Sequence, residues 1–354
     1  MRIGSVWIGG DHPIAVQSMT TTRTEDLRAT LAEIHALEEA GAEMIRVAVP
    51  MEESAKVLAT IKAEMSVPLI ADIHFDPRMA ILSMEAGVDK IRLNPGNIGR
   101  RERVERIVDM AKDKGIPIRI GVNSGSVEKE FLDKYGSPTP AAMVESALKH
   151  IRILEDHDFE DIVLSLKSSD TLAALRAYRM ASDRIPYPLH LGITEAGQPG
   201  YGEIKSAAGL GALLLDGIGD TIRISLSGDS TLEVAAAFDI LKATGRRVMD
   251  PEVVACPSCG RIEIDLFPLV EEVEKYAKTL GKRPIKITVL GCIVNGPGEA
   301  READIGIAGG RDQGLVYRRG ELIRKVPQSG LLAALKEEVE RFFEEQDAME
   351  ALEA

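Results

Sequence analysis

The sequence predicts a chain of two parts, an N-terminal (β/α)8 TIM barrel followed by a small α+β domain. Three observations predict this fold: the length of 354 residues, a regular alternation of strand-like and helix-like segments up to about residue 245, and a different alternation after it. Roughly 250 residues is the usual size of a (β/α)8 barrel, and this length suits about two domains. We therefore expect a substrate-binding barrel over residues 1–245 and a second domain over residues 246–354.

Eight short apolar segments recur in the first part, and each is followed by a stretch with helical periodicity. The expected strands cover residues 16–19, 44–49, 69–73, 90–94, 118–122, 161–167, 189–193 and 221–226. Leu27 and Leu31 illustrate the helical spacing, and Gly41 is a helix stop before the next strand. Such alternation favours a parallel sheet covered by helices. We expect the preceding hairpin, residues 3–10, to plug one end of the barrel.

Residue parity along these strands separates an apolar face from a polar one, because successive side chains point to opposite sides. The apolar face, with residues such as Ile45, Ile118 and Leu164, is expected to meet the helices. The other face must point into the barrel, although barrel interiors are normally filled with Val, Ile and Leu. It carries Arg46, Asp72, His74, Arg92, Asn94, Arg119, Asn123, Ser165, Lys167, His190, Thr194, Arg223, Ser225 and Ser227.

Five of these inward residues are Arg or Lys, and an unpaired buried charge loses several kcal/mol of hydration. A single inward cation often belongs to a fixed ion-pair network, and Asp72 has the charge to neutralise one of them. The excess of cations favours an anionic ligand instead, and the fork of Arg suits phosphate oxygens. We predict a phosphorylated or diphosphorylated substrate at the C-terminal strand ends, where the long connection of residues 121–140 is placed to close over it.

Composition and charge exclude other classes of protein. The 43 basic and 56 acidic side chains leave a net charge of −13, which disfavours binding to a nucleic-acid backbone. No apolar run approaches the roughly 18 to 20 residues that span a bilayer, and the first residues lack the apolar core of a signal peptide. We expect a cytoplasmic protein without nucleic-acid or membrane partners.

The second domain contains all three cysteines of the chain. Strands are expected over residues 252–255, 285–290, 305–308 and 315–317, and helices over residues 266–280 and 328–346, with a solvated acidic tail after them. Cys256 and Cys259 form a C-x-x-C pair, and Cys292 follows a strand and a glycine. This clustering is typical of a metal site.

Three interpretations of the cysteines compete. Zinc fits the C-x-x-C knuckle but lacks a usual fourth ligand, since there is no second C-x-x-C pair and the last histidine is His190. A redox disulfide between the paired cysteines leaves Cys292 unexplained. An iron–sulfur cluster tolerates three thiolates and an unusual fourth ligand, for which Glu299 on a glycine-rich turn is a candidate.

These motifs resemble those of the 4-hydroxy-3-methylbut-2-en-1-yl diphosphate synthase family over nearly the whole chain. They are Cys256-Pro-Ser-Cys259-Gly-Arg, Gly291-Cys292-Ile-Val-Asn-Gly-Pro-Gly-Glu299-Ala, Val16-Gln-Ser-Met-Thr, Ala71-Asp-Ile-His-Phe, Arg92-Leu-Asn-Pro-Gly-Asn and Leu191-Gly-Ile-Thr-Glu-Ala-Gly. Their order and approximate spacing agree with the bacterial two-domain form of the family.

The resemblance implies a 4Fe–4S enzyme of the methylerythritol phosphate route to isoprenoids. It implies reductive ring opening of 2-C-methyl-D-erythritol 2,4-cyclodiphosphate to the linear allylic diphosphate, with two electrons from a ferredoxin or flavodoxin. It further implies that Cys256, Cys259, Cys292 and Glu299 hold the cluster. It also implies a homodimer in which the cluster domain of one subunit covers the barrel mouth of the other.

A cyclic diphosphate supplies the anion that Arg46, Arg92, Arg119, Lys167 and Arg223 need, and Asn94, Asn123 and Thr194 are then ligand-orienting groups. Hydroxyl loss needs a proton, for which Glu195 is the first candidate donor and His74 and Asp72 are the second choices. Glu195 has an alternative role as a structural hydrogen-bonding group at a turn.

Two other functions share part of this pattern. A zinc-stabilised phosphosugar aldolase or hydrolase on a TIM barrel would share the cationic interior without needing a reductant. A cluster-bearing regulatory or electron-transfer module would share the cysteines without needing phosphate ligands.

Overall fold

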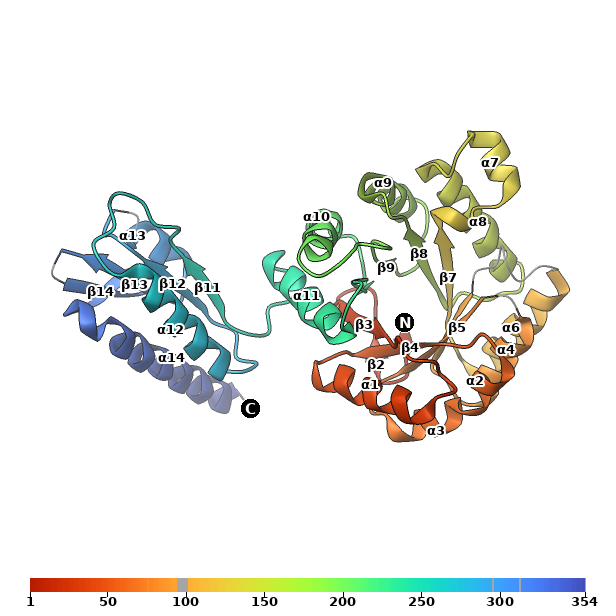
Figure 1. The fold of residues 1–354 in the computed structure, drawn as a ribbon, viewed down its shortest axis with the longest axis horizontal. Coiled ribbons are helices and arrows are strands. Elements are labelled where there is room, and N and C mark those ends of the chain that lie inside the picture. The colour runs from red at the N-terminus through yellow and green to blue at the C-terminus, as the bar shows by residue number, and fades with distance from the viewer. Residues whose placement is uncertain (75, 94–100, 295, 312, 354) are drawn as a thin grey trace. The chain divides into compact units, whose positions relative to one another are not determined.

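The chain divides into two compact units, Met1–Arg247 and Val248–Ala354 (Figure 1). The computed structural model describes residues 1–74, 76–93, 101–294, 296–311 and 313–353. Each unit has its own sheet and its own apolar core.

The first unit is built on an eight-stranded parallel sheet in the order β8-β7-β6-β5-β4-β3-β10-β9. An isolated parallel bridge between Leu164 and Leu189 joins the two ends of that order. The sheet is therefore a nearly closed barrel, and the predicted TIM-barrel fold is confirmed. Its strands are β3 (Ala15–Met19), β4 (Met44–Ala48), β5 (Leu69–Ile73), β6 (Lys90–Leu93), β7 (Ile118–Asn123), β8 (Ile162–Lys167), β9 (His190–Leu191) and β10 (Thr221–Ile222).

Helices follow the strands and surround the barrel (Figure 1). Five of them begin after an Asp or Thr whose side chain accepts a backbone N–H of the first turn, which satisfies a donor that has no partner within the helix: Asp26, Asp76, Thr139, Asp170 and Asp229. The helices of this unit are α1 (Leu27–Glu39), α2 (Glu52–Lys56), α3 (Leu58–Glu64), α4 (Pro77–Glu85), α6 (Arg101–Lys114), α7 (Lys129–Tyr135), α8 (Pro140–Glu155), α9 (Thr171–Ser182), α10 (Tyr201–Leu215) and α11 (Ser230–Ala243).

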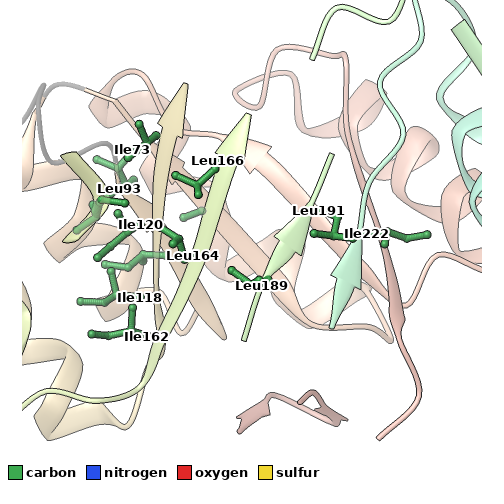
Figure 2. Close-up of a cluster of buried hydrophobic side chains, with 14 of the residues drawn as sticks. Ile73, Leu93, Ile118, Ile120, Ile162, Leu164, Leu166, Leu189, Leu191 and Ile222 are labelled. Atoms are coloured by element: carbon green, nitrogen blue, oxygen red, sulfur yellow. The ribbon is translucent and has the colours of Figure 1, made fainter. Parts of the chain in front are cut away.

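The apolar face of the barrel strands forms the main core against the helices, as parity predicts. Ile45, Ile118 and Leu164 are buried in this cluster together with apolar residues of the helices. Figure 2 shows part of the layer, with Ile118, Ile120 and Ile162 grouped beside β7 and β8. The barrel is thus stabilised mainly from outside, which leaves its interior free for polar groups.

The N-terminal hairpin closes one end of the barrel, as predicted. Strands β1 (Arg2–Ile3) and β2 (Val6–Trp7) pair antiparallel. Ile3 and Ile8 are fully buried in a small apolar cluster with inward residues of the barrel strands, namely Ala15, Met44, Ile70 and Val163. Apolar packing therefore separates this end of the interior from solvent.

Two features of the barrel differ from the prediction. Strands β9 and β10 are two residues long, because the chain beyond them leaves regular pairing and returns only at an isolated bridge between Gly197 and Leu226. The long connection after β7 is an ordered turn and helix, η1 (Ser124–Ser126) followed by α7. Glu128 bonds this connection to α8 through His150 Nε2 at 2.6 Å, so it is docked rather than open.

The second unit is the predicted α+β domain, with a five-stranded sheet in the order β11-β12-β13-β14-β15. The first three strands are parallel and the last two antiparallel. Strand β15 was not expected, because its side chains are largely exposed and no apolar alternation marks it. The elements are β11 (Glu252–Ala255), α12 (Leu266–Thr279), β12 (Lys286–Leu290), α13 (Gly296–Glu299), η2 (Ala300–Glu302), β13 (Ile305–Gly310), β14 (Gln313–Arg318), β15 (Glu321–Val326), η3 (Gln328–Gly330) and α14 (Leu331–Glu353).

The last helix differs in extent from its prediction over residues 328–346. It begins at Leu331 and continues through the acidic end of the chain to Glu353. An ion pair supports this extension, since Asp347 pairs with Arg283. Over the described residues, no helix has the length and apolar character required to cross a membrane.

We expect Ile8→Ala to destabilise the barrel unit by about 3 kcal/mol, because it leaves a cavity where a fully buried side chain closes the barrel end. Urea denaturation followed by tryptophan fluorescence measures this directly, since Trp7 is the only tryptophan in the chain. Leu172→Ala, at a half-exposed position on α9, is the matched control and should change the unfolding free energy by less than about 1 kcal/mol. Equal losses of unfolding free energy in the two variants would contradict the role of Ile8 in closing the barrel end.

Candidate active site

The barrel interior contains a group of buried basic side chains. Among the described residues, Arg46, Lys90, Arg92, Arg119 and Lys167 are each less than a tenth exposed, and Arg223 is partly buried beside them. Buried acids are fewer, and only Asp72 and Glu233 pair with these cations in the described part of the chain. The interior therefore carries an excess of positive charge.

Asp72, at the end of β5, is the centre of one ion-pair network. Its Oδ1 accepts a hydrogen bond from Arg92 Nη1 at 3.2 Å. Its Oδ2 lies 3.3 Å from His74 Nε2 and 3.8 Å from Arg46 Nε. Burial alone would raise the pKa of Asp72, but Arg46, the hydrogen bond with His74 and the charge of Arg92 together lower this pKa well below its ordinary value. The carboxyl group is therefore ionised at neutral pH.

Arg223 forms a second ion pair with Glu233, a buried residue of α11. Arg223 Nη2 donates to Glu233 Oε2 at 3.2 Å, and the same carboxylate accepts from Ser18 Oγ and from the Leu226 backbone N–H. The thioether of Met19 lies between the two networks, where it accepts from Arg46 Nη2 at 2.8 Å and lies 3.7 Å from Arg223 Nη1. These contacts hold the two guanidinium groups in fixed positions.

Two glycines make room for the cations. A Cβ atom on Gly121 would lie 2.5 Å from Arg92 Nε, and one on Gly192 would lie 2.7 Å from Lys167 Nζ. Real Cβ atoms do not approach other atoms so closely, so larger residues at either position would displace the charged group. Gly121 in β7 and Gly192 after β9 therefore leave the space that the Arg92 and Lys167 side chains occupy.

Arg119 differs from the other guanidinium groups. Its Nε, Nη1 and Nη2 atoms are all buried without a hydrogen-bond partner among the described residues. Burial, followed by the charges of Arg46 and Arg92, lowers the pKa of Arg119 well below its ordinary value. Such a group is costly to bury unless an anion binds to it.

The rim of the barrel holds the remaining predicted residues of this site. His74 and Thr194 are partly buried. The Ser126 hydroxyl accepts from the backbone N–H of Asn123 and donates to its backbone carbonyl. Glu195 is exposed and has a positive φ of 54°, a conformation unusual for a residue with a side chain. Such strain is common at functional sites. Asn94 lies outside the described residues.

The cysteines lie in the second unit, at the carboxyl ends of adjacent parallel strands. Cys256 follows β11 and Cys292 follows β12, and the backbone N–H of Cys256 donates to Val289 in β12 at 2.9 Å. Cys259 lies three residues beyond Cys256, and none of the three forms a disulfide. Glu299 is exposed at the end of α13.

This donor set fits a thiolate-bound metal centre in its chemistry and in its place at one sheet edge, because soft sulfur ligands favour iron–sulfur clusters and zinc. Within the described ranges, however, no group of three or more His, Cys, Asp or Glu side chains lies close enough together to hold a metal ion. The structure thus brings Cys256 and Cys292 to one edge of the sheet without closing a coordination sphere among the described residues.

Sequence reasoning missed three buried polar residues in or beside the barrel interior. Lys90 and Gln17 are buried on the inward face of β6 and β3, and the parity rule would have found both if it had been extended to the first residue of β6 and to β3. Glu233 gave no such signal, because it lies on a helix and reaches Arg223 only in the folded chain.

Comparisons with known proteins agree with the fold and the motifs. The family model of the GcpE TIM-barrel domain matches residues 1–238, and that of the GcpE protein C-terminal domain matches residues 252–341. Two solved structures share the fold alone. The spore coat polysaccharide biosynthesis protein spsE of Bacillus subtilis has a TM-score of 0.53 at 12% identity, over 69% of this chain and 72% of its own. The N-acetylneuraminic acid synthetase of Leptospira borgpetersenii has a TM-score of 0.50 at 14% identity, over 80% and 98%.

Curated relatives are much more similar. The 4-hydroxy-3-methylbut-2-en-1-yl diphosphate synthase (flavodoxin) of Anoxybacillus flavithermus is 56% identical over 98% of this chain and 94% of its own. The enzymes of that name from Bacillus pumilus and Listeria monocytogenes are 56% and 55% identical, each over 99% of this chain and over 95% and 96% of their own. These matches give no support to the zinc-stabilised aldolase or hydrolase. The chain belongs to the GcpE family of 4-hydroxy-3-methylbut-2-en-1-yl diphosphate synthases, as its motifs predict.

Proposed function

We propose that this chain converts 2-C-methyl-D-erythritol 2,4-cyclodiphosphate into 4-hydroxy-3-methylbut-2-en-1-yl diphosphate. The ring opens at a carbon–oxygen bond to phosphate, and a hydroxyl group leaves as water. Two electrons and two protons enter, so the products are the linear diphosphate and one water molecule. The reaction therefore needs an anion site, a proton donor and a source of electrons.

The excess of buried cations in the barrel is the observation that carries this proposal. Asp72 and Glu233 offset part of the charge of Arg46, Arg92 and Arg223. Arg119 has no such partner in the described part of the chain. A diphosphate supplies the missing negative charge, and several cations acting together suit its many oxygen acceptors. We assign Arg46, Arg92, Asn94, Arg119, Asn123, Lys167, Thr194 and Arg223 to substrate binding.

Glu195 is our candidate for the proton donor. Asp72 is less suited to this role, because its lowered pKa keeps it ionised and it is engaged by cations. His74 bonds to Asp72, which orients its ring, and it is the second candidate. Glu195 is exposed in a strained turn at the C-terminal end of the barrel strands, where catalytic groups of this fold are found.

Cys256, Cys259, Cys292 and Glu299 are the residues that would hold a 4Fe–4S cluster in the second unit. When bound, such a cluster supplies electrons to the reaction. The thiols themselves provide soft ligands at the ends of β11 and β12. Gly291, directly before Cys292, leaves space for the Ile262 side chain, since a Cβ on this glycine would lie 3.3 Å from it.

The names of the relatives support flavodoxin as the electron donor, with ferredoxin as the alternative. Free cysteines and a protein reductant are compatible with the reducing cytoplasm, which is where we place the enzyme. We also infer a homodimer in which the active site is shared between subunits. This inference rests on the family resemblance.

Anaerobically purified or reconstituted chain should contain iron and acid-labile sulfide and should turn over the cyclic diphosphate with reduced flavodoxin. Cys292→Ser should lose both the cluster and turnover while the far-ultraviolet circular dichroism and Trp7 fluorescence stay unchanged, because Cys292 lies outside the barrel unit. Measurements are metal and sulfide analysis and product detection. Absence of labile sulfide after reconstitution, or full activity of Cys292→Ser, would refute this function.

Arg119→Met should raise the dissociation constant of the cyclic diphosphate by about tenfold or more, about 1.4 kcal/mol. Without substrate and in halide-free buffer, the variant should not lose stability, because the guanidinium has no partner among the described residues to lose. Arg223→Met is the comparison, since it leaves the buried Glu233 carboxylate unpaired and should cost about 2 kcal/mol of stability. Calorimetric titration and denaturation measure the two effects. A stability loss in Arg119→Met would instead make Arg119 a structural cation.

Glu195→Gln should lower kcat by about 100-fold and leave the substrate dissociation constant nearly unchanged, because an amide cannot donate the proton of a carboxylic acid. Glu53→Gln, at an exposed position of α2, is the control and should behave as the unaltered chain. Single-turnover kinetics with pre-reduced enzyme separate this step from electron delivery. An unchanged kcat would assign Glu195 to the turn alone and leave His74 as the donor.

A further inference from the structure

The interior layers below the proposed substrate site contain buried polar groups that the proposed function does not use. The atoms concerned are Lys90 Nζ, both side-chain polar atoms of Gln17, and His190 Nε2. Each is buried and lacks a hydrogen-bond partner among the residues that the structure describes. With Arg119 beside them, we call Gln17, Lys90, Arg119 and His190 the polar floor.

The topology places the polar floor in two adjacent layers of the barrel. In this fold, alternate strands contribute the four side chains of each interior layer. Gln17, Arg119 and His190 come from β3, β7 and β9, one alternate set, whereas Lys90 comes from β6 in the other set. The strand register also places Lys90 next to the hairpin, since Lys90 pairs with Ile70, whose side chain packs in the apolar cluster with Ile3 and Ile8. The hairpin thus closes the polar floor from below.

Charge in the polar floor is not balanced. Burial, followed by the charges of Arg119 and Arg46, lowers the pKa of Lys90 well below its ordinary value, so its ammonium form is costly here unless an anion lies beside it. Burial and the charges of Arg119, Lys167 and Lys90 likewise lower the pKa of His190, so this ring is neutral. Its Nδ1 lies 2.8 Å from Thr221 Oγ1, which leaves Nε2 to face the interior. The carboxylates of Asp72 and Glu233 are already engaged by other cations.

Donors in the polar floor also exceed acceptors. The ammonium of Lys90, the guanidinium of Arg119 and the amide of Gln17 supply donors, whereas acceptors come only from the Gln17 carbonyl and, in one tautomer, the His190 ring. A water molecule would supply hydrogen-bonding partners but no negative charge. An anion would satisfy donors and offset the cations together.

We propose that the polar floor binds a small inorganic monoanion of the halide class, separate from the diphosphate of the substrate. Lys90 and Arg119 supply its charge partners, and Gln17 Nε2 supplies a neutral donor. A halide suits this place because it is small and accepts hydrogen bonds from any direction, and because the cluster of Ile3 and Ile8 beneath it is apolar. The bound anion would hold Arg119 in place below the substrate site.

Bromide is the probe for this site. Crystals of the anaerobically purified full chain grown in sodium bromide should show an anomalous peak beside Lys90, Arg119 and Gln17. The midpoint of thermal unfolding should rise with bromide concentration at constant ionic strength, because a ligand of the folded state stabilises it.

Lys90→Met should weaken bromide binding by about tenfold or more and should still fold, since it removes a buried charge. Lys56→Met, an exposed lysine of α2, is the control and should bind bromide as the unaltered chain does.

Several outcomes decide the proposal. Gln17→Leu should also weaken bromide binding, by a smaller factor, and it serves as the second variant if Lys90→Met does not fold. Retention of the bromide peak with saturating cyclic diphosphate supports a separate site. Displacement by the cyclic diphosphate would assign the polar floor to a substrate phosphate and overturn the proposal, as would the absence of an anomalous peak or equal bromide dependence in Lys90→Met. None of these outcomes depends on iron, sulfide or turnover, so the proposed function is tested independently.

Discussion

Buried positive charge is the constraint on which this barrel depends. A (β/α)8 barrel usually fills its interior with branched apolar side chains, whose burial contributes to its stability. Here much of that space is occupied by basic groups, so stability must come from elsewhere. The outer apolar layer between strands and helices and the Ile3 and Ile8 plug supply it. The arrangement separates the apolar layers that stabilise the fold from the cationic interior that we propose as the substrate site.

The few interior acids determine which cations are fixed and which remain available. Asp72 holds Arg92 and lies near Arg46 and His74, and its low pKa keeps that contact ionised across the neutral range. Glu233 does the same for Arg223 from a helix outside the barrel. Arg119 receives no such partner in the described part of the chain. An anion bound at the proposed site would meet guanidinium groups that are already oriented, together with Arg119, whose charge has no partner among the described residues. Such pre-organisation lowers the ordering cost of binding.

Sequence parity predicted the orientation of the barrel residues well, because the alternation of side chains in a strand is a local geometric rule. It correctly placed Ile45 outside and Arg46 inside. It did not predict where β9 and β10 end, since those ends depend on contacts such as the bridge between Gly197 and Leu226. Glu233 was missed for the same reason, because its role depends on tertiary structure. The ordered helix α7 was also not expected, because the pair that docks it, between Glu128 at its start and His150 of α8, forms only in the folded chain. The cysteine ligand set was predicted by motif, and its coordination stays a prediction.

Both units place their candidate functional groups by one topological rule. Parallel strands bring their carboxyl ends to one edge, and loops leaving that edge converge. In the barrel, His74 and Glu195 lie beyond β5 and β9, and in the second unit Cys256 and Cys292 lie beyond β11 and β12. The antiparallel strands β14 and β15 reverse direction, so their ends do not converge with these, and neither carries a candidate site residue. The parallel pairing of β11 with β12 is therefore the feature that brings two cysteines far apart in sequence to one edge of the sheet.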